Sequence, residues 1–90
     1  MSFAAKVVVY VTEYCPYCVR AKMLLDKKGV SYQTVDVSND TAKRSWLAQA
    51  TGRRTVPQIF INDQAVGGCD DLYALDRGGK LEPMLQKAAG

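Results

Sequence analysis

The sequence predicts an α/β fold, with a four-stranded mixed sheet and helices on both faces. Three observations predict it. The first half of the chain has a strand, helix and strand pattern, and the second half has two short strands followed by a helix. A Cys-x-x-Cys motif, Cys15 to Cys18, stands between the first strand and the first helix. The 90 residues correspond to a single domain, residues 1–90.

The two strands of the first half have different patterns. Residues 6–12 are almost continuously apolar and β-branched, which is typical of a strand buried on both faces in the centre of a sheet. Residues 30–37 alternate with a period of two, which indicates a second strand. A helix between them makes a βαβ unit, so we expect parallel strands with a right-handed crossover.

The first helix is predicted at residues 19–29, directly after the second cysteine. Val19, Met23 and Leu24 recur at helical spacing, with Ala21 and Leu25 beside them, so we expect these residues on the apolar face. Gly29 follows two lysines and suits the left-handed conformation that ends many helices.

The second helix is predicted at residues 42–51. Asp40 or Thr41 can cap its start by accepting a hydrogen bond from a free backbone amide. Trp46 and Leu47 are expected to form its apolar face.

The second half continues with a third strand at residues 58–61 and a short fourth strand at residues 65–66, close enough for a β-hairpin. Asp70 and Asp71 open a third helix, and residues 81–87 form a last short one. A βαβ unit followed by a ββα unit is the thioredoxin-like arrangement. We therefore expect the strand order 2-1-3-4, with the third strand antiparallel to the first and the cysteines at the carboxyl end of the central strand.

Composition limits the function classes. The chain is 48% hydrophobic and 23% charged, as in ordinary globular domains. Its net charge of +3 is mild, and the chain contains no long run of basic residues, so a solvated surface is favoured over nucleic-acid binding. No apolar stretch is long enough to span a membrane. Residues 1–6 lack an export signal, so a cytoplasmic location is expected.

The cysteine and histidine counts limit the chemistry further. The chain has three cysteines and no histidine. A Cys–His nucleophile and a histidine-containing zinc site are therefore excluded, and three cysteines are too few for a Cys₄ site within one chain. In a reducing compartment, the pair is more often redox-active or metal-binding than structural. A structural disulfide and a pair of metal ligands, including half of a site shared across a dimer, stay open as alternatives to redox chemistry.

The position of the pair favours redox chemistry. With Cys15 as the N-cap residue, Pro16 takes the first helical position, where its missing amide is not needed. The free amides of Tyr17 and Cys18 are then expected to point at the Cys15 sulfur and, with the helix dipole, to favour its thiolate. Cys15 thus becomes the attacking thiol, and the more enclosed Cys18 the resolving one.

Three segments together resemble the glutaredoxin family. They are the Cys-Pro-Tyr-Cys motif at residues 15–18, the Thr-Val-Pro at residues 55–57, and Gly-Gly-Cys-Asp-Asp at residues 67–71. The resemblance covers residues 7–85 and is strongest to the small dithiol proteins of bacteria. It implies a glutathione-dependent thiol–disulfide oxidoreductase that acts as a monomer on disulfide-containing or glutathionylated proteins, ribonucleotide reductase being one candidate. It implies no tightly bound cofactor, with glutathione as co-substrate.

The resemblance also implies a glutathione groove. Thr55, Val56 and Pro57 correspond to the family's cis-proline loop, in which the backbone of Val56 can pair with glutathione as an added strand would. Tyr17 is implied as part of the wall. Arg44 stands where the family has a polar or basic residue that meets the glycyl carboxylate.

The start of the third helix is implied to hold the other end of glutathione. Its free amides, near Cys69, suit the γ-glutamyl carboxylate, and the Asp70 carboxylate suits the amino group beside it. Other interpretations stay open for both residues. Asp70 is also a plain helix-capping residue. Cys69 is either a small residue whose backbone amide matters or, in the sharper alternative, an oxidation-prone or dimer-forming thiol.

One position departs from the family pattern. The family usually has a lysine three residues before the first cysteine, where this chain has Thr12 followed by Glu13. A nearby carboxylate disfavours a thiolate, so weaker glutathione binding or a less acidic Cys15 is expected unless Arg44 compensates.

Two other functions remain as alternatives. A redoxin of the same fold reduced by thioredoxin reductase is disfavoured by the implied glutathione groove. A module that binds an iron–sulfur cluster between two subunits is disfavoured by Pro16 and Cys18, because such glutaredoxins usually have a single active-site cysteine with no proline after it.

Overall fold

Eight helices and strands follow one another along residues 4–87, the part of the chain that the computed structural model describes. In chain order they are β1 (Val7–Val11), α1 (Pro16–Lys28), β2 (Gln33–Asp36), α2 (Thr41–Thr51), β3 (Gln58–Ile61), β4 (Gln64–Gly67), α3 (Cys69–Arg77) and α4 (Leu81–Gln86). The two ends of the predicted domain, and half of the segment inspected for an export signal, lie outside the described residues. None of the helices within the described range is long and apolar enough to cross a membrane.

The sheet has the predicted order, β2-β1-β3-β4. β1 pairs with β2 in parallel and with β3 in antiparallel orientation, and β4 pairs antiparallel with β3. Every residue of β1 except Tyr10 is buried, as expected for a central strand between two partners. The thioredoxin-like α/β fold is therefore confirmed.

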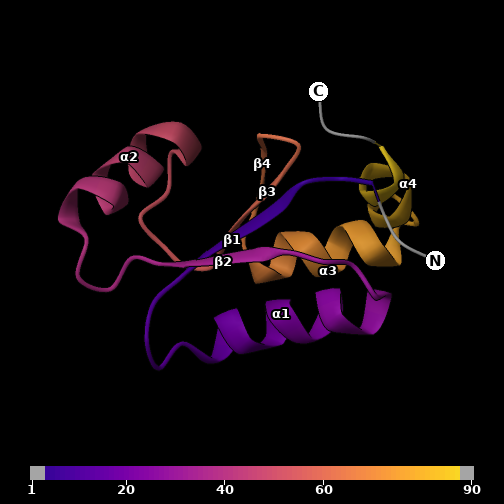
Figure 1. Cartoon of the computed structure of the whole chain (residues 1–90), viewed down its shortest axis with the longest axis horizontal. Coiled ribbons are helices and arrows are strands. Elements are labelled where there is room, and N and C mark those ends of the chain that lie inside the picture. The colour runs from indigo at the N-terminus through magenta and orange to yellow at the C-terminus, as the bar shows by residue number, and fades with distance from the viewer. Residues whose placement is uncertain (1–3, 88–90) are drawn as a thin grey trace.

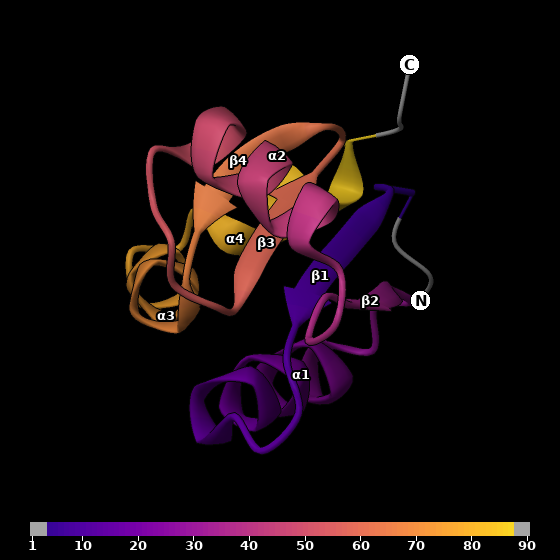
Figure 2. The same cartoon turned by 90° about the vertical axis from the view of Figure 1, so that its left-hand side faces the viewer.

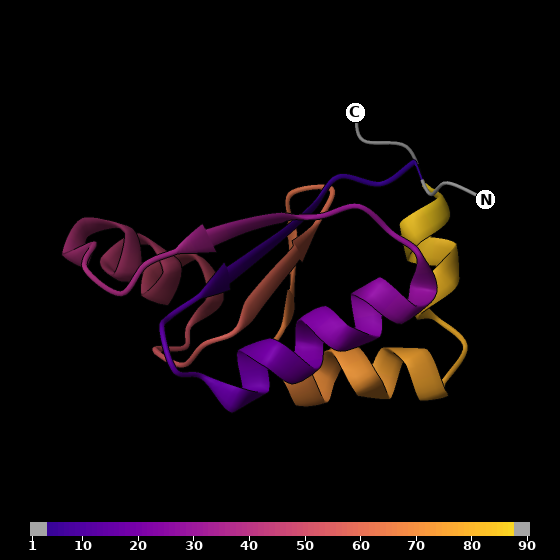
Figure 3. The same cartoon turned by 60° about the horizontal axis from the view of Figure 1, so that its bottom comes forward.

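The helices cover both faces of the sheet. α1 and α3 lie side by side on one face, and α2 lies on the other (Figures 1 and 2). α4 packs beside the end of α3, close to the chain segment that leads into β1 (Figure 3). There the Ala5 amide donates to the Leu85 carbonyl over 3.0 Å. The carboxyl end of β1 and the start of α1 are left uncovered at the opposite end of the molecule (Figure 3).

The main core lies between the sheet and the helices α1, α3 and α4. Alternate residues of β1 and β3 face it, because side chains along a strand point to opposite sides. Its buried members from the strands are Val7, Val9, Val11, Ile59 and Ile61, and those from the helices are Cys18, Ala21, Leu24, Leu25, Cys69, Leu72, Leu81 and Leu85.

The apolar face predicted for α1 is wrong at two positions. Val19 and Met23 are 51% and 61% exposed, whereas Ala21, Leu24 and Leu25 are buried as predicted. The buried stripe runs from these three residues to Cys18 and leaves out Val19 and Met23. This stripe also has helical spacing, and the contact with α3 and the sheet decides between the two faces. Because Cys18 faces the core, the next residue, Val19, faces the solvent.

Most predicted helix ends are confirmed. Gly29 ends α1 in the left-handed conformation, with φ 76°. Of the two candidate caps of α2, Asp40 is the one used, and its carboxylate accepts a hydrogen bond from the Lys43 amide over 2.9 Å. α3 begins one residue earlier than the Asp70-Asp71 pair suggested, at Cys69, with Gly68 as its N-cap.

An aromatic cluster attaches α2 to the sheet. Trp46 stacks on Phe60 with ring centroids 5.8 Å apart, and Tyr10 contacts both rings at 5.4–5.7 Å. Leu47 is buried beside the cluster as predicted, whereas Trp46 keeps 46% of its surface exposed. Trp46 therefore contributes through its ring contacts more than through full burial.

We expect Trp46→Ala to lower the free energy of unfolding by about 2 kcal/mol, because it removes two aromatic pairs and leaves α2 with few contacts to the sheet. Urea denaturation followed by circular dichroism measures this difference. Tyr14→Ala is the matched control, since Tyr14 is 98% exposed, and it should change stability by less than about 0.5 kcal/mol. Equal effects of the two substitutions would contradict the role of the cluster.

Candidate active site

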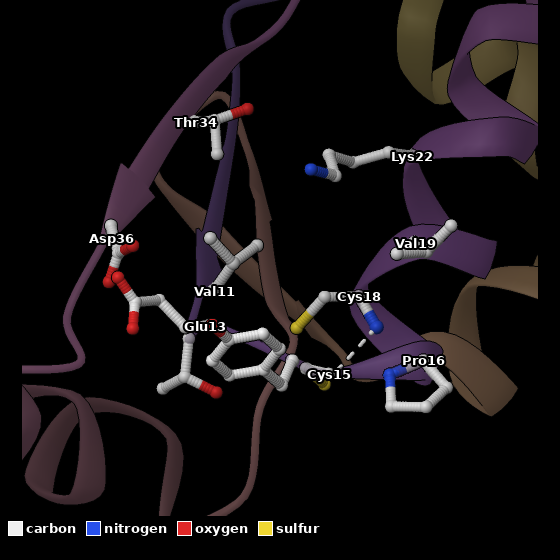
Figure 4. Close-up of a pocket in the computed structure, with 11 residues that line it drawn as sticks. Val11, Glu13, Cys15, Pro16, Cys18, Val19, Lys22, Thr34 and Asp36 are labelled. Atoms are coloured by element: carbon white, nitrogen blue, oxygen red, sulfur yellow. Dashed lines mark hydrogen bonds between the residues drawn. The ribbon is translucent and has the colours of Figure 1, made fainter.

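The turn between β1 and α1 places Cys15 at the start of a helix. Cys15 is the N-cap residue with extended backbone angles, and Pro16 occupies the first helical position. The Cys18 amide donates a hydrogen bond to the Cys15 sulfur over 3.3 Å, drawn as a dashed line in Figure 4. Two amides were expected to donate to the Cys15 sulfur. The structure shows this hydrogen bond for the Cys18 amide and not for the Tyr17 amide. The arrangement favours negative charge on this sulfur.

The second cysteine has a different environment. Cys18 is 2% exposed and lies one helical turn after Cys15. Burial, together with the hydrogen bond to Cys15, raises the pKa of the Cys18 thiol to about 12, although the Thr12 backbone and Lys22 act in the opposite direction. Cys18 is therefore protonated at neutral pH and is the weaker nucleophile in the resting dithiol state.

The loop before β3 lies against the cysteine pair. The peptide bond between Val56 and Pro57 is cis, in agreement with the resemblance. The Cys15 thiol donates to the Val56 carbonyl over 3.8 Å, a long contact of the kind that sulfur makes. The buried Gln58 side chain donates to the Thr55 carbonyl over 2.9 Å and so holds the loop from behind.

The start of α3 is held by an ion pair that the sequence did not indicate. Asp71 accepts hydrogen bonds from the Gly68 amide at 2.9 Å and from the Arg53 guanidinium at 2.6 Å. The hydrogen bond from Gly68 and then that from Arg53 lower the pKa of the Asp71 carboxyl. Gly67 has φ 114°, and a Cβ there would lie 2.4 Å from the Asp71 carboxylate. The third helix is thereby joined to the segment after α2.

These segments enclose a groove of about 350 Å³ beside the cysteine pair. We call it the Val56 groove, and its lining residues come from α1, the cis-proline loop and the start of α3. They are Tyr17, Arg53, Thr55, Val56, Pro57, Gly68, Cys69, Asp70 and Asp71. Six of the seven residues that the sequence suggested for glutathione line this groove. Arg44 is the exception.

Arg44 lies in a small neighbouring crevice, which it shares with Arg53, Arg54, Thr55 and Val56. Three arginines thus stand at the edge of the Val56 groove nearest α2. Arg53 is the one that also lines the groove itself, although its pairing with Asp71 had not been foreseen.

Cys69 is a buried thiol, 5% exposed, at the first position of α3. Burial raises the pKa of this thiol, which keeps it protonated. The simpler of its two interpretations is therefore favoured: Cys69 is a small buried side chain at a position that lines the Val56 groove.

A second groove of about 550 Å³ lies on the other side of the pair, between α1 and β2 (Figure 4). We call it the Asp36 groove. Its lining residues are Val11, Thr12, Glu13, Tyr14, Cys15, Pro16, Cys18, Val19, Lys22, Thr34 and Asp36. This groove was not predicted from the sequence, although Lys22 stands one turn after Cys18 and Thr34 and Asp36 share one side of a strand.

A model of the glutaredoxin family matches residues 7–66 of the chain. The chain belongs to the glutaredoxin family. This glutaredoxin is 55% identical over 82 residues to glutaredoxin 3 of Escherichia coli strain K12, a match that covers 91% of this chain and 99% of that protein. It is 52% identical to a glutaredoxin of Pseudomonas aeruginosa, covering 88% and 94% of the two chains.

Solved structures agree with the sequence relatives. This glutaredoxin matches the crystal structure of a buckwheat glutaredoxin–glutathione complex with a TM-score of 0.85 and 43% identity, over 90% of this chain and 76% of that one. It is accordingly a thiol–disulfide oxidoreductase. Among residues 4–87, no group of three or more potential side-chain ligands is arranged to hold a metal ion.

We expect the alkylation rate of Cys18 by iodoacetamide to rise about tenfold per pH unit from pH 8 to pH 11, because only the thiolate reacts and the pKa of Cys18 is raised to about 12. The Cys15→Ser variant isolates this reaction, and mass spectrometry identifies the modified residue. The same variant in denaturing urea is the control and should level off near pH 9. Levelling at that pH in the folded protein would show that burial does not protect Cys18.

Proposed function

We propose that this glutaredoxin uses glutathione to reduce protein disulfides and mixed disulfides between proteins and glutathione. Cys15 attacks the disulfide, and Cys18 or glutathione resolves the product. The Val56 groove carries the proposal, because it combines the backbone of the cis-proline loop, which lies against the Cys15 sulfur, with the start of a helix. The related buckwheat glutaredoxin, whose crystal structure is a complex with glutathione, supports the same ligand.

The groove suits glutathione along its whole length. The backbone of Val56 can pair with the cysteinyl unit, which places the glutathione sulfur at Cys15. The first amides of α3, at Cys69 and Asp70, lack partners within the helix and suit the γ-glutamyl carboxylate. The Asp70 side chain suits the adjacent amino group, and Tyr17 forms the outer wall.

The glycyl carboxylate falls to the arginine side of the groove. Arg53 lines the groove, and Arg44 shares the neighbouring crevice with it. We assign the contact to this pair of guanidinium groups together with Thr55. Because Thr12 replaces the usual lysine, the arginines supply the positive charge for this end of glutathione.

The chemistry begins at Cys15. Its thiolate attacks one sulfur of the disulfide, a new bond to Cys15 forms, and the electron pair of the broken bond leaves on the second sulfur, which takes up a proton. Ionisation of Cys15 also ends its hydrogen bond to the Val56 carbonyl and frees that oxygen for the incoming ligand.

The mixed disulfide is then resolved. Cys18 loses its proton and attacks the Cys15 sulfur, which releases the bound thiol and leaves a Cys15–Cys18 disulfide that glutathione reduces. Glutathione can also attack the mixed disulfide directly. The raised pKa of Cys18 keeps it from competing with Cys15 in the first step.

The proposal extends to the setting of the reaction. The partners are disulfide-containing or glutathionylated proteins, with ribonucleotide reductase as one candidate, and the protein acts as a monomer in the cytoplasm without a tightly bound cofactor. A compartment with abundant glutathione keeps Cys15 and Cys18 in the dithiol form that the structure describes.

A coupled assay tests the electron donor. With NADPH, glutathione and glutathione reductase, we expect sustained reduction of the mixed disulfide of glutathione and 2-mercaptoethanol, read as loss of NADPH absorbance. With NADPH and thioredoxin reductase in place of the glutathione system, we expect no turnover. Activity only with thioredoxin reductase would overturn the proposal. A brown dimer with cluster absorption bands would instead favour the iron–sulfur alternative.

Cys18→Ser separates the two kinds of substrate. We expect it to keep the reduction of glutathione mixed disulfides, which needs Cys15 and free glutathione alone, and to lose at least about 90% of the reduction of protein disulfides that need a second thiol. Cys69→Ser is the control and should keep both activities, because the proposed role of this residue lies in its backbone amide, which serine retains, and its side chain is buried. Loss of both activities in Cys18→Ser would contradict the assigned roles.

A further inference from the structure

The Asp36 groove has no role in the reaction described so far, yet it opens beside both cysteines. Apolar side chains gather around it. Val11, Pro16 and Val19 line it, and Tyr14 on its edge is 98% exposed. Met23, 61% exposed, follows Val19 by one helical turn. Exposed apolar side chains around a groove at a reactive centre indicate a surface that contacts a polypeptide.

The groove also carries an acidic wall that is built into the fold. The Ser38 hydroxyl accepts a hydrogen bond from the Glu13 amide over 2.8 Å, and the Ser38 amide donates to the Asp36 carboxylate over 2.8 Å. This link joins the loop after β1 to the end of β2, and the Glu13 and Asp36 side chains both line the groove (Figure 4). The hydrogen bonds from the Ser38 side chain and backbone lower the pKa of the Asp36 carboxyl.

Lys22 is the charged residue on the opposite wall, and Figure 4 shows its side chain extending from α1 toward the groove. The groove is therefore negative along the side formed by β2 and the loop after β1, and positive along α1. A basic side chain of a ligand is attracted to Glu13 and Asp36 and repelled by Lys22, which orients it across the groove.

The two grooves beside the cysteine pair thus differ in charge. Arg53 lines the Val56 groove together with Asp70 and Asp71, and Arg44 and Arg54 lie in the crevice next to it, so the cations are at the α2 side of this groove and the carboxylates at the start of α3. Glutathione carries two carboxylates and one amino group, so the arginine side attracts it and the Glu13–Asp36 wall repels it. A ligand of the Asp36 groove therefore differs from glutathione and carries positive charge.

We propose that the Asp36 groove binds the polypeptide next to the target cysteine of a protein disulfide, and that Glu13 and Asp36 select segments with lysine or arginine beside that cysteine. The proposal rests on the proposed function, since it assigns a substrate class to the same reactive cysteines. Tyr14, Val19 and Met23 supply contact area for the polypeptide, and the carboxylates supply the selectivity.

Three disulfide-cyclised peptides test the selectivity. They are identical except that both cysteines are flanked on their outer sides by arginine, alanine or glutamate. With glutathione, glutathione reductase and NADPH, we expect kcat/KM for the arginine peptide to exceed that for the alanine peptide about fivefold and that for the glutamate peptide about tenfold. The preference should weaken as salt concentration rises.

The double variant Glu13→Gln/Asp36→Asn should reduce the arginine-to-glutamate ratio to within about twofold. Each protein is compared across its own three peptides, so a change in Cys15 reactivity cancels from the ratio. Asp63→Asn/Glu82→Gln is the matched control, because it removes two exposed carboxylates that lie outside both grooves. This control should keep the wild-type ratio.

Equal rates for the three peptides in the wild type, or an unchanged ratio in Glu13→Gln/Asp36→Asn, would overturn the assignment of the Asp36 groove. Equal loss of the ratio in the control variant would also overturn it, since overall charge would then be the cause. In each case, turnover of the small glutathione mixed disulfide would show that the proposed function still holds. Absence of that turnover would overturn the proposed function and this inference together.

Discussion

The hydrogen bond from the Cys18 amide to the Cys15 sulfur is the contact on which the rest of the site depends. It makes a thiol the N-cap of α1, a role usually taken by an oxygen side chain, and so places the reactive atom where helix amides are free. A chain without histidine needs no side-chain base if the helix start stabilises the thiolate. β1 is the buried central strand, and Cys15 follows its carboxyl end. The same contact therefore holds the Cys15 sulfur at this end of the sheet, between the two grooves.

The site separates its tasks by environment more than by residue type. Cys15 and Cys18 are the same amino acid, but one faces the cis-proline loop and the other is buried against the core. The grooves also differ in how charge is arranged: three arginines stand at the α2 side of the Val56 groove, whereas Glu13 and Asp36 form one wall of the Asp36 groove. A single reactive sulfur can then serve a small thiol and a polypeptide without one surface having to fit both.

Local patterns predicted much of this molecule. The β-branched run of β1, the glycine after α1 and the cysteine at a helix start each depend on neighbours in sequence, and each is confirmed. The face of α1 was predicted wrongly at Val19 and Met23, because two stripes of equal period compete and α3 selects the one through Cys18. The ion pair of Arg53 and Asp71, and the groove lined by Lys22 and Asp36, join segments far apart in the chain. Hydrophobic periodicity does not predict contacts between distant segments of the chain. The family resemblance, in contrast, predicted most residues of the Val56 groove.

Gly67 and Asp71 have a consequence for protein engineering. The space that a side chain at position 67 would need is occupied by the carboxylate that holds the start of α3 and pairs with Arg53. The two positions therefore cannot be varied independently. A library that randomises position 67 while keeping Asp71 would return mostly glycine at position 67. Redesigning this glutaredoxin for a thiol other than glutathione means changing positions 53, 67 and 71 as one unit, with the cysteine pair left intact.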